Sequence, residues 1–167
     1  SKACVDYSTS GLENPLTHLL LAAFLALYLH QPPSPRRTFW LALLAALSML
    51  NRLDVGLLCL PALAYALGER ITRPALAAAL AGGTPFALWE AFSLFYYGSL
   101  FPNTALAKLN LGLIRRSGLA RQGFAYLLNS LSLDPLTLAL IGLAFLVPLA
   151  RRQRRLWLPA LGLPLYL

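Results

Sequence analysis

Long apolar runs alternate along this chain with short polar or basic breaks. The runs cover residues 15–30, 38–51, 54–68, 74–97, 135–150 and, in part, 156–167. They consist mostly of Leu and Ala, which favour helices, rather than the Val and Ile that favour strands. Lipid offers the backbone no hydrogen-bond partner, and these runs lack the strict alternation of a barrel strand. The pattern therefore predicts an all-α, polytopic transmembrane helix bundle, with about five complete spans and a partial sixth in a single domain over residues 1–167.

Proline and glycine mark the breaks. The segment 31–37, Gln-Pro-Pro-Ser-Pro-Arg-Arg, must end the first helix. Gly82-Gly83-Thr84-Pro85 lies inside the run 74–97 and is expected to kink that helix. The non-spanning stretch 98–134 mixes basic and apolar residues, which suits a short helix lying in the membrane interface.

Residues 38–67 allow two interpretations. They could form one helix of about 30 residues with charges in the middle, or two helices that meet at Asn51-Arg52-Leu53-Asp54. A span needs about 20 residues, and a charge at mid-bilayer costs roughly 2.5 to 3.5 kcal/mol. Two short helices joined at a water-accessible turn avoid that cost, so this interpretation is preferred.

Composition supports the membrane interpretation. The chain is 58% hydrophobic and 12% charged, against about 25% charged residues in a soluble domain. Its net charge of +8 would suggest nucleic acid in a soluble protein. Here the basic residues lie at the ends of apolar runs, so no nucleic-acid partner is expected. Cys4 and Cys59 form no metal motif, and no disulfide is expected between them.

Basic residues also predict the orientation. When the loops are alternated, eight of the 14 basic residues fall in tight loops on one side: Arg36, Arg37, Arg70, Arg73 and the four arginines of 151–155. That side is predicted to be cytoplasmic. Three polar segments then converge on the outer side: the N-terminal residues, the turn at 51–54 and the loop 98–134.

Four candidate site residues follow from charge and position. Glu13 is either a site residue or a first-turn acid that complements the helix dipole. Arg52 and Asp54 are either site residues or a local ion pair and helix cap. Glu90 lies within an apolar helix, so it should face the bundle interior or a wet cavity.

The segment 97–108, Tyr-Gly-Ser-Leu-Phe-Pro-Asn-Thr-Ala-Leu-Ala-Lys, is the most distinctive run. Tyr97 belongs to an aromatic belt, and Gly, Pro and Asn103 give a tight turn. Lys108 is a flexible point charge of the kind that holds a phosphate. By pattern alone, the run is a helix exit at the lipid headgroups.

Three segments carry a resemblance to a known family. Residues 10–16, Ser-Gly-Leu-Glu-Asn-Pro-Leu, 51–56, Asn-Arg-Leu-Asp-Val-Gly, and 97–108 occur in the order found in bacterial GT-C-fold glycosyltransferases that use polyprenyl-phosphate sugars. The chain resembles the mycobacterial terminal arabinofuranosyltransferase type. The resemblance implies a multi-pass protein of the bacterial cytoplasmic (inner) membrane. It would move a sugar from a polyprenyl-phosphate donor to a glycan, lipid or protein acceptor on the outer side.

The same resemblance assigns roles to the matched residues. Arg52 and Lys108 would hold the donor phosphate, and Asp54 and Glu13 would bind sugar hydroxyls or position the basic residues. Asn103 would complete the site. No cofactor and no metal are expected. The reaction also needs a base for the acceptor hydroxyl and a stabilised phosphate leaving group.

The sequence departs from the family at two places. The acidic pair of the family's first outward loop has no match, so the chain is expected to be an internal fragment, inactive alone, with its base upstream. Leu53 and Val55 replace the usual Pro and Gly of the second segment. The alternative functions are a transporter or flippase of lipid-linked sugars and a non-catalytic membrane scaffold. An upstream acidic pair would favour the transferase, whereas repeated halves or broken helices would favour a transporter.

Overall fold

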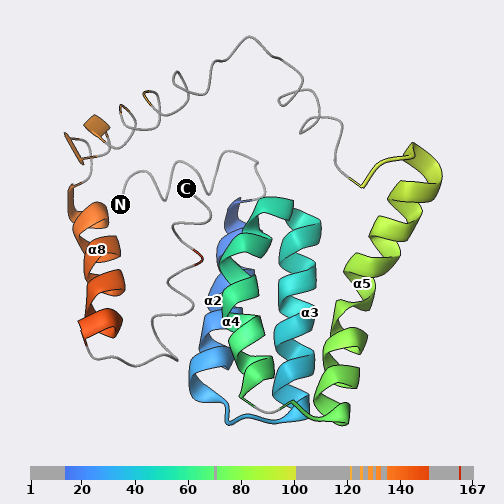
Figure 1. Cartoon of the computed structure of the whole chain (residues 1–167). Helices are drawn as coiled ribbons and strands as arrows, with labels where there is room; N and C mark the ends of the chain where they lie inside the picture. Colours follow the sequence, from blue (N-terminus) through green and yellow to red (C-terminus); the bar gives the residue numbers. More distant parts are fainter. Residues whose placement is uncertain are drawn as a thin grey trace. The chain divides into compact units, whose positions relative to one another are not determined.

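Helices joined by short turns make up the described part of the chain. A computed structural model describes residues 14–69, 71–100 and 135–150, with the single positions 121, 125, 128, 129, 131, 132 and 162. Its elements are α2 (Asn14–His30), α3 (Pro35–Asn51), η1 (Leu53–Val55), α4 (Gly56–Gly68), α5 (Arg73–Tyr97) and α8 (Pro135–Ala150) (Figure 1). These residues include no strand, which confirms the all-α prediction.

The turn between α3 and α4 settles the two interpretations of residues 38–67 in favour of two helices. Helix α3 ends at Asn51, and Arg52 adopts an extended backbone with φ −150° and ψ 118°. The 3-10 turn η1, which contains Asp54, then leads into α4, so Asp54 stands just before the amino end of α4. An acid there is stabilised by the positive end of the helix dipole. Helix α3 also begins earlier than predicted, because Ser34 caps it and Pro35 suits a first helical position.

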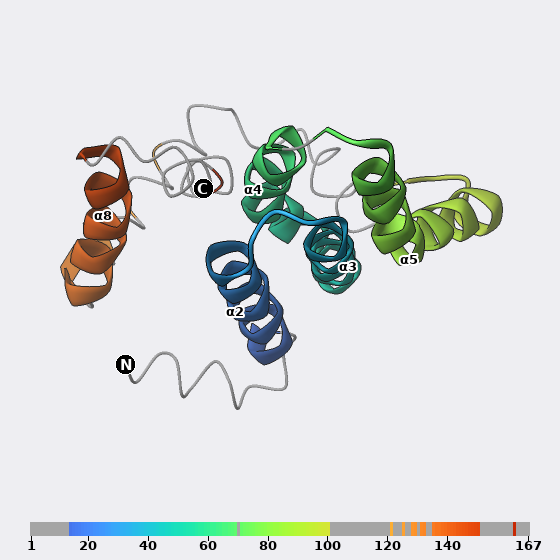
Figure 2. The same ribbon diagram turned by 90° about the horizontal axis from the view of Figure 1, so that it is seen from below.

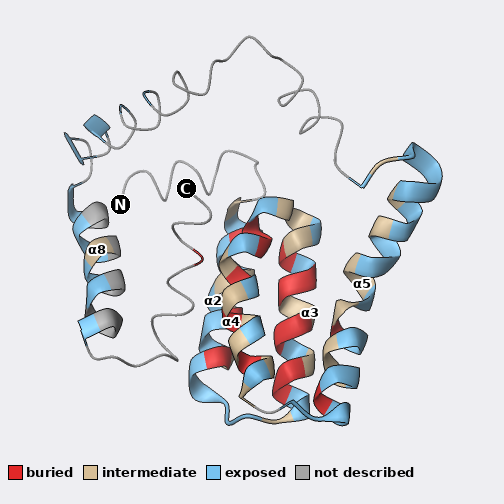
Figure 3. Cartoon of the chain, in the orientation of Figure 1, coloured by how far each residue is buried: buried red, intermediate tan, exposed pale blue. Residues whose placement is uncertain are grey.

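Helices α2, α3 and α4 pack together as three antiparallel helices, which Figure 2 shows from below. Their core combines two large aromatic side chains from α2 with Leu41 and small side chains from the other two helices. It consists of Phe24, Tyr28, Leu41, Ala45, Cys59, Ala62 and Ala66, and Figure 3 colours the buried positions of the three helices red. The Phe24 and Tyr28 rings are parallel, with centroids 6.5 Å apart. Alanine on α3 and α4 leaves the room that these rings fill.

Helix α5 continues through Gly82-Gly83-Thr84-Pro85 without a break, and the predicted kink there stays a prediction. At Gly82, α5 comes very close to α3: a Cβ placed on Gly82 would lie 2.8 Å from Ala42 Cβ and 2.9 Å from Leu43 N. Helix α5 ends at Tyr97, and the next residue, Gly98, has a φ of 67°, which glycine adopts most readily. The Gly98 N–H donates to Leu94 O at 3.1 Å, a common way to close a helix.

Helix length separates α5 from the other described helices. Within the described residues, α5 alone is both long and apolar enough to cross a membrane, while Asn14–His30 and Leu53–Gly68 are shorter apolar helices. A core helix of a soluble protein can match α5 in length and composition, but only 11% of the most apolar window of α5 is buried. Contacts divide the chain into two compact units, residues 1–92 with 153–167 and residues 93–152.

Candidate functional site

Two predicted site residues, Arg52 and Asp54, form an ion pair at the turn between α3 and α4. Arg52 Nη2 donates to Asp54 Oδ2 at 2.8 Å, and Arg52 Nε donates to Asp54 Oδ1 at 3.2 Å. Both side chains remain partly exposed, Arg52 by 33% and Asp54 by 45%. The local ion pair considered from the sequence therefore exists, and both charged groups remain accessible to a ligand.

Backbone and side-chain contacts hold this turn in place. The Arg52 N–H donates to Ser48 O at 2.8 Å, and the Val55 N–H donates to Arg52 O at 3.1 Å. Asn51 Nδ2 donates to Thr17 Oγ1 at 2.7 Å, which joins the end of α3 to the start of α2. The beginning of α2 and the Arg52 turn therefore lie at the same end of the three-helix unit, in agreement with the predicted alternation of loops.

Glu90 and Tyr97 lie on α5. Glu90 is half-buried, while its neighbours Trp89 and Ala91 are exposed. Tyr97 is the last residue of the helix and is 58% exposed, with its ring edge-on to Tyr96 at 4.8 Å between centroids. The helix exit predicted at Tyr97 and Gly98 is confirmed.

The remaining predicted site residues, Glu13, Asn103 and Lys108, lie outside the described residues. Their predicted convergence with Arg52 stays a prediction. No group of three or more His, Cys, Asp or Glu side chains among the described positions could hold a metal ion.

Sequence reasoning missed a second polar cluster, at the opposite end of the three-helix unit. Arg37 was expected to be a loop charge, but its side chain is 2% exposed and pairs with Glu69 at 2.8 Å. Arg37 Nη2 also donates to the carbonyl oxygen of Tyr28 at 2.9 Å. Sequence position gave no signal for this cluster, since Arg36 and Arg37 both stand in the first turn of α3, where the helix dipole disfavours a cation.

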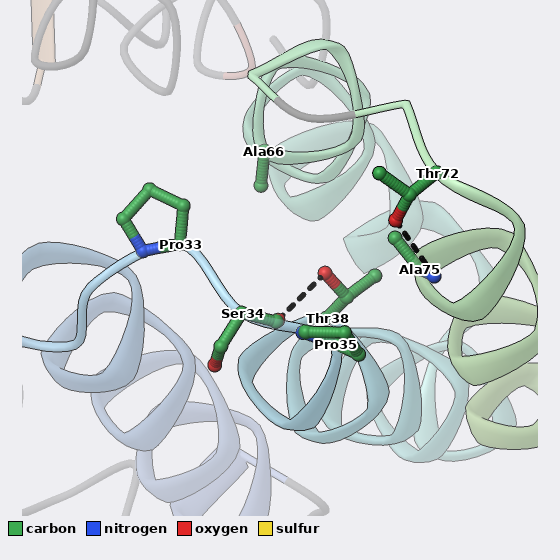
Figure 4. Close-up of a pocket in the computed structure, with 7 residues that line it drawn as sticks. All are labelled: Pro33, Ser34, Pro35, Thr38, Ala66, Thr72 and Ala75. Carbon is green, nitrogen blue, oxygen red and sulfur yellow. Dashed lines mark hydrogen bonds between the residues drawn. The ribbon is translucent and has the colours of Figure 1, made fainter.

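A small pocket opens near this second cluster (Figure 4). It is lined by Pro33, Ser34, Pro35, Thr38, Ala66, Thr72 and Ala75. Its two threonine hydroxyls already take part in helix-start bonds: Thr38 Oγ1 donates to Ser34 O at 3.2 Å, and Thr72 Oγ1 accepts from the Ala75 N–H at 3.3 Å. The pocket carries no charged lining residue, so the Arg52 turn is the better candidate site.

The Arg52 turn offers a partly exposed guanidinium next to a carboxylate. A guanidinium binds carboxylate or phosphate through parallel N–H bonds, and the carboxylate accepts bonds from hydroxyls. This pair therefore suits a phosphorylated, hydroxyl-rich ligand. No protein-family model, curated protein or solved structure matches this chain.

Proposed function

We propose that the chain belongs to a multi-pass protein of the bacterial cytoplasmic membrane. Helix α5 is long and apolar enough to span, and large apolar side chains are exposed on all five described α-helices. Examples are Leu19 and Leu29 on α2, Leu80 and Leu88 on α5, and Leu136 on α8. A soluble monomer rarely exposes so many large apolar side chains, whereas lipid solvates them without cost. The shorter helices α2, α3 and α4 would cross beside α5 as one packed unit.

Within that setting, the function is transfer of a sugar from a polyprenyl-phosphate donor to an envelope glycan, lipid or protein acceptor. One observation carries this proposal: the partly exposed Arg52–Asp54 pair at a helix junction. That junction is the segment that resembles the family's Thr-Arg-Pro-Asp-Gly sequence. The tie from Asn51 to Thr17 gives further support, because it brings the start of α2, next to the first resembling segment, to the same end.

The Arg52 guanidinium changes partner when the donor binds. In the absence of donor, Nε and Nη2 hold the Asp54 carboxylate. A donor phosphate replaces that carboxylate as the bidentate partner, and Asp54 then accepts bonds from sugar hydroxyls. Lys108 adds a second positive charge to the phosphate, while Glu13, Asn103, Glu90 and Tyr97 shape the rest of the site. A phosphate held by two cations is the better leaving group.

Binding of polyprenyl phosphate to the full-length protein tests the phosphate assignment directly. Polyprenol, which lacks the phosphate, is the matched ligand. Arg52→Ala and Lys108→Ala should each weaken binding of the phosphate at least about tenfold, since one charge-assisted contact contributes roughly 1.5–3 kcal/mol. Neither should change binding of polyprenol. Arg36→Ala is the control, because Arg36 is an exposed arginine at the other end of the three-helix unit.

The Asp54→Asn substitution distinguishes two roles of the Arg52–Asp54 pair, that of a ligand site and that of a structural ion pair. If Arg52 binds phosphate, Asp54→Asn leaves the phosphate affinity unchanged or improves it, but it lowers the rate of sugar transfer. If the pair only caps α4, Arg52→Ala and Asp54→Asn destabilise the protein alike, and phosphate affinity stays unchanged in both. That second result would refute the proposed function. Retained transport of a lipid-linked sugar without transfer to an acceptor would instead favour the flippase alternative.

A further inference from the structure

Two neighbouring arginines at the start of α3 have opposite environments. Arg36 is exposed, whereas Arg37 is only 3% exposed as a residue. The Arg37 N–H donates to Ser34 Oγ at 3.2 Å, which places it in the first turn of the helix. From there its side chain turns inward, toward the ends of α2 and α4. The two arginines therefore serve different purposes, although the sequence presents them as one basic pair.

Arg37 contacts all three helices of the unit. Its Nη1 donates to Glu69 Oε2 at 2.8 Å, at the end of α4. Its Nη2 donates to the Tyr28 carbonyl oxygen at 2.9 Å, in the last turn of α2. The guanidinium carbon also lies 5.2 Å from the centroid of the buried Tyr28 ring, within cation–π range. One side chain thus connects the start of α3 with the ends of its two neighbours.

The helix dipoles make these contacts favourable only when the helices are assembled. A cation in the first turn of α3 and an anion at the end of α4 each lie at the unfavourable end of their own helix. In the assembled unit, Arg37 meets the carbonyl end of α2, and Glu69 lies beside the amino end of α3. The Tyr28 carbonyl is among those that an α-helix leaves without an intrahelical partner, so Arg37 also satisfies it.

We propose that Arg37 and Glu69 form an electrostatic lock that closes this end of the α2–α4 unit. Glu69 is its release point: it is the more exposed partner, at 17% against 2% for Arg37, and it stands where the chain leaves α4 for α5. Loss of the Glu69 charge leaves Arg37 buried without its counter-ion, and the ends of α2 and α4 then separate from α3. The opposite end, at Arg52, has no such buried pair among the described residues and stays accessible.

The buried thiol of Cys59 is a built-in reporter of this lock. Cys59 is 0% exposed and belongs to the core of the unit, so it reacts only when the helices part. The experiment uses the full chain with Cys4→Ser, in membranes, and measures the rate of Cys59 labelling by N-ethylmaleimide, an uncharged reagent. Arg37→Ala and Glu69→Gln should each raise the labelling rate by about tenfold or more, because breaking a buried ion pair strands a charge. Arg36→Ala, the matched neighbour, should leave the rate unchanged.

Two further variants keep the test decisive if a single substitution prevents folding. Arg37→Lys retains the charge but lacks the planar fork that reaches Glu69 and Tyr28 together, so its rate should fall between those of wild type and Arg37→Ala. The double variant Arg37→Met with Glu69→Gln removes both charges, and its rate should lie below the rates of Arg37→Met and Glu69→Gln measured singly. Equal rates for Arg36→Ala and Arg37→Ala, or additive effects in the double variant, would overturn the lock. Neither readout depends on sugar transfer or phosphate binding.

Discussion

The close approach of α5 to α3 at Gly82 makes a sharp prediction about stability. A methyl group at this position would lie 2.8 Å from Ala42 Cβ and 2.9 Å from Leu43 N, and closer still to the Phe39 carbonyl oxygen. Two of these three neighbours are backbone atoms within a helix, so they cannot move away singly. Gly82→Ala therefore forces the two helices apart or displaces α5 along α3.

The next residue provides the matched control. A Cβ at Gly83 would have nothing within 4 Å, and both positions lie inside the same helix. Either substitution gains about 0.8–1 kcal/mol from the helix propensity of alanine over glycine. Gly82→Ala alone adds overpacking, which costs about 1–3 kcal/mol. Because the propensity gain is common to both, the free energy of unfolding should be about 1–3 kcal/mol lower for Gly82→Ala than for Gly83→Ala.

Reversible unfolding in mixed detergent micelles, titrated with dodecyl sulfate and followed by tryptophan fluorescence, measures this difference. Trp40 on α3 and Trp89 on α5 provide signals on both helices. Gly83→Ala should be as stable as the wild type or more stable. If the two variants agree within about 0.5 kcal/mol, the helices do not pack through Gly82, and the proposed small-residue contact is refuted.

Two further predictions concern the end of α5 and the core. Gly98→Ala places a side chain at φ 67°, which costs about 1–2 kcal/mol, so amide exchange in the last turn of α5 should speed up. Gly98→Asn, which tolerates this conformation better, should exchange more slowly than Gly98→Ala, and equal exchange would contradict the left-handed helix end. Phe24→Ala empties a core position that is 1% exposed and should lower the free energy of unfolding by about 3–5 kcal/mol. Phe95→Ala, at a position 91% exposed, should lower it far less, and a similar loss for both would mean that Phe24 is not in the core.

Local signals were sufficient to locate the helices. The predicted run 15–30 became Asn14–His30, the run 74–97 became Arg73–Tyr97, and the run 135–150 became Pro135–Ala150. Apolar composition and proline or glycine breaks act within a few residues, so a single sequence carries them fully. The turn at Arg52 was also predictable, since charges at mid-bilayer are costly and the two pairing residues are only two positions apart.

In the candidate sites, too, the local contact could be predicted from the sequence and the long-range contact could not. The Arg52–Asp54 pair is local and was foreseen as one of two possibilities, whereas the Arg37–Glu69 pair joins residues 32 positions apart and was not. Both Arg37 and Arg36 looked like loop charges, because nothing in their neighbourhood distinguishes a side chain that turns inward from one that faces out. The direction of each arginine side chain depends on which helix end lies opposite it once the helices have packed.

The sequence by itself determined where the helices lie to within a few residues, that they are apolar, and which polar turns separate them. Tertiary structure decided which faces meet: the aromatic rings of α2 against alanines of α3 and α4, and Gly82 against the backbone of α3. It also decided that Arg37 is buried while Arg36 is exposed. The physical reason is the distance along the chain over which each kind of interaction acts. Helix propensity and breaks depend on neighbours in the chain, whereas burial and ion pairing depend on distances that exist only after the helices have packed.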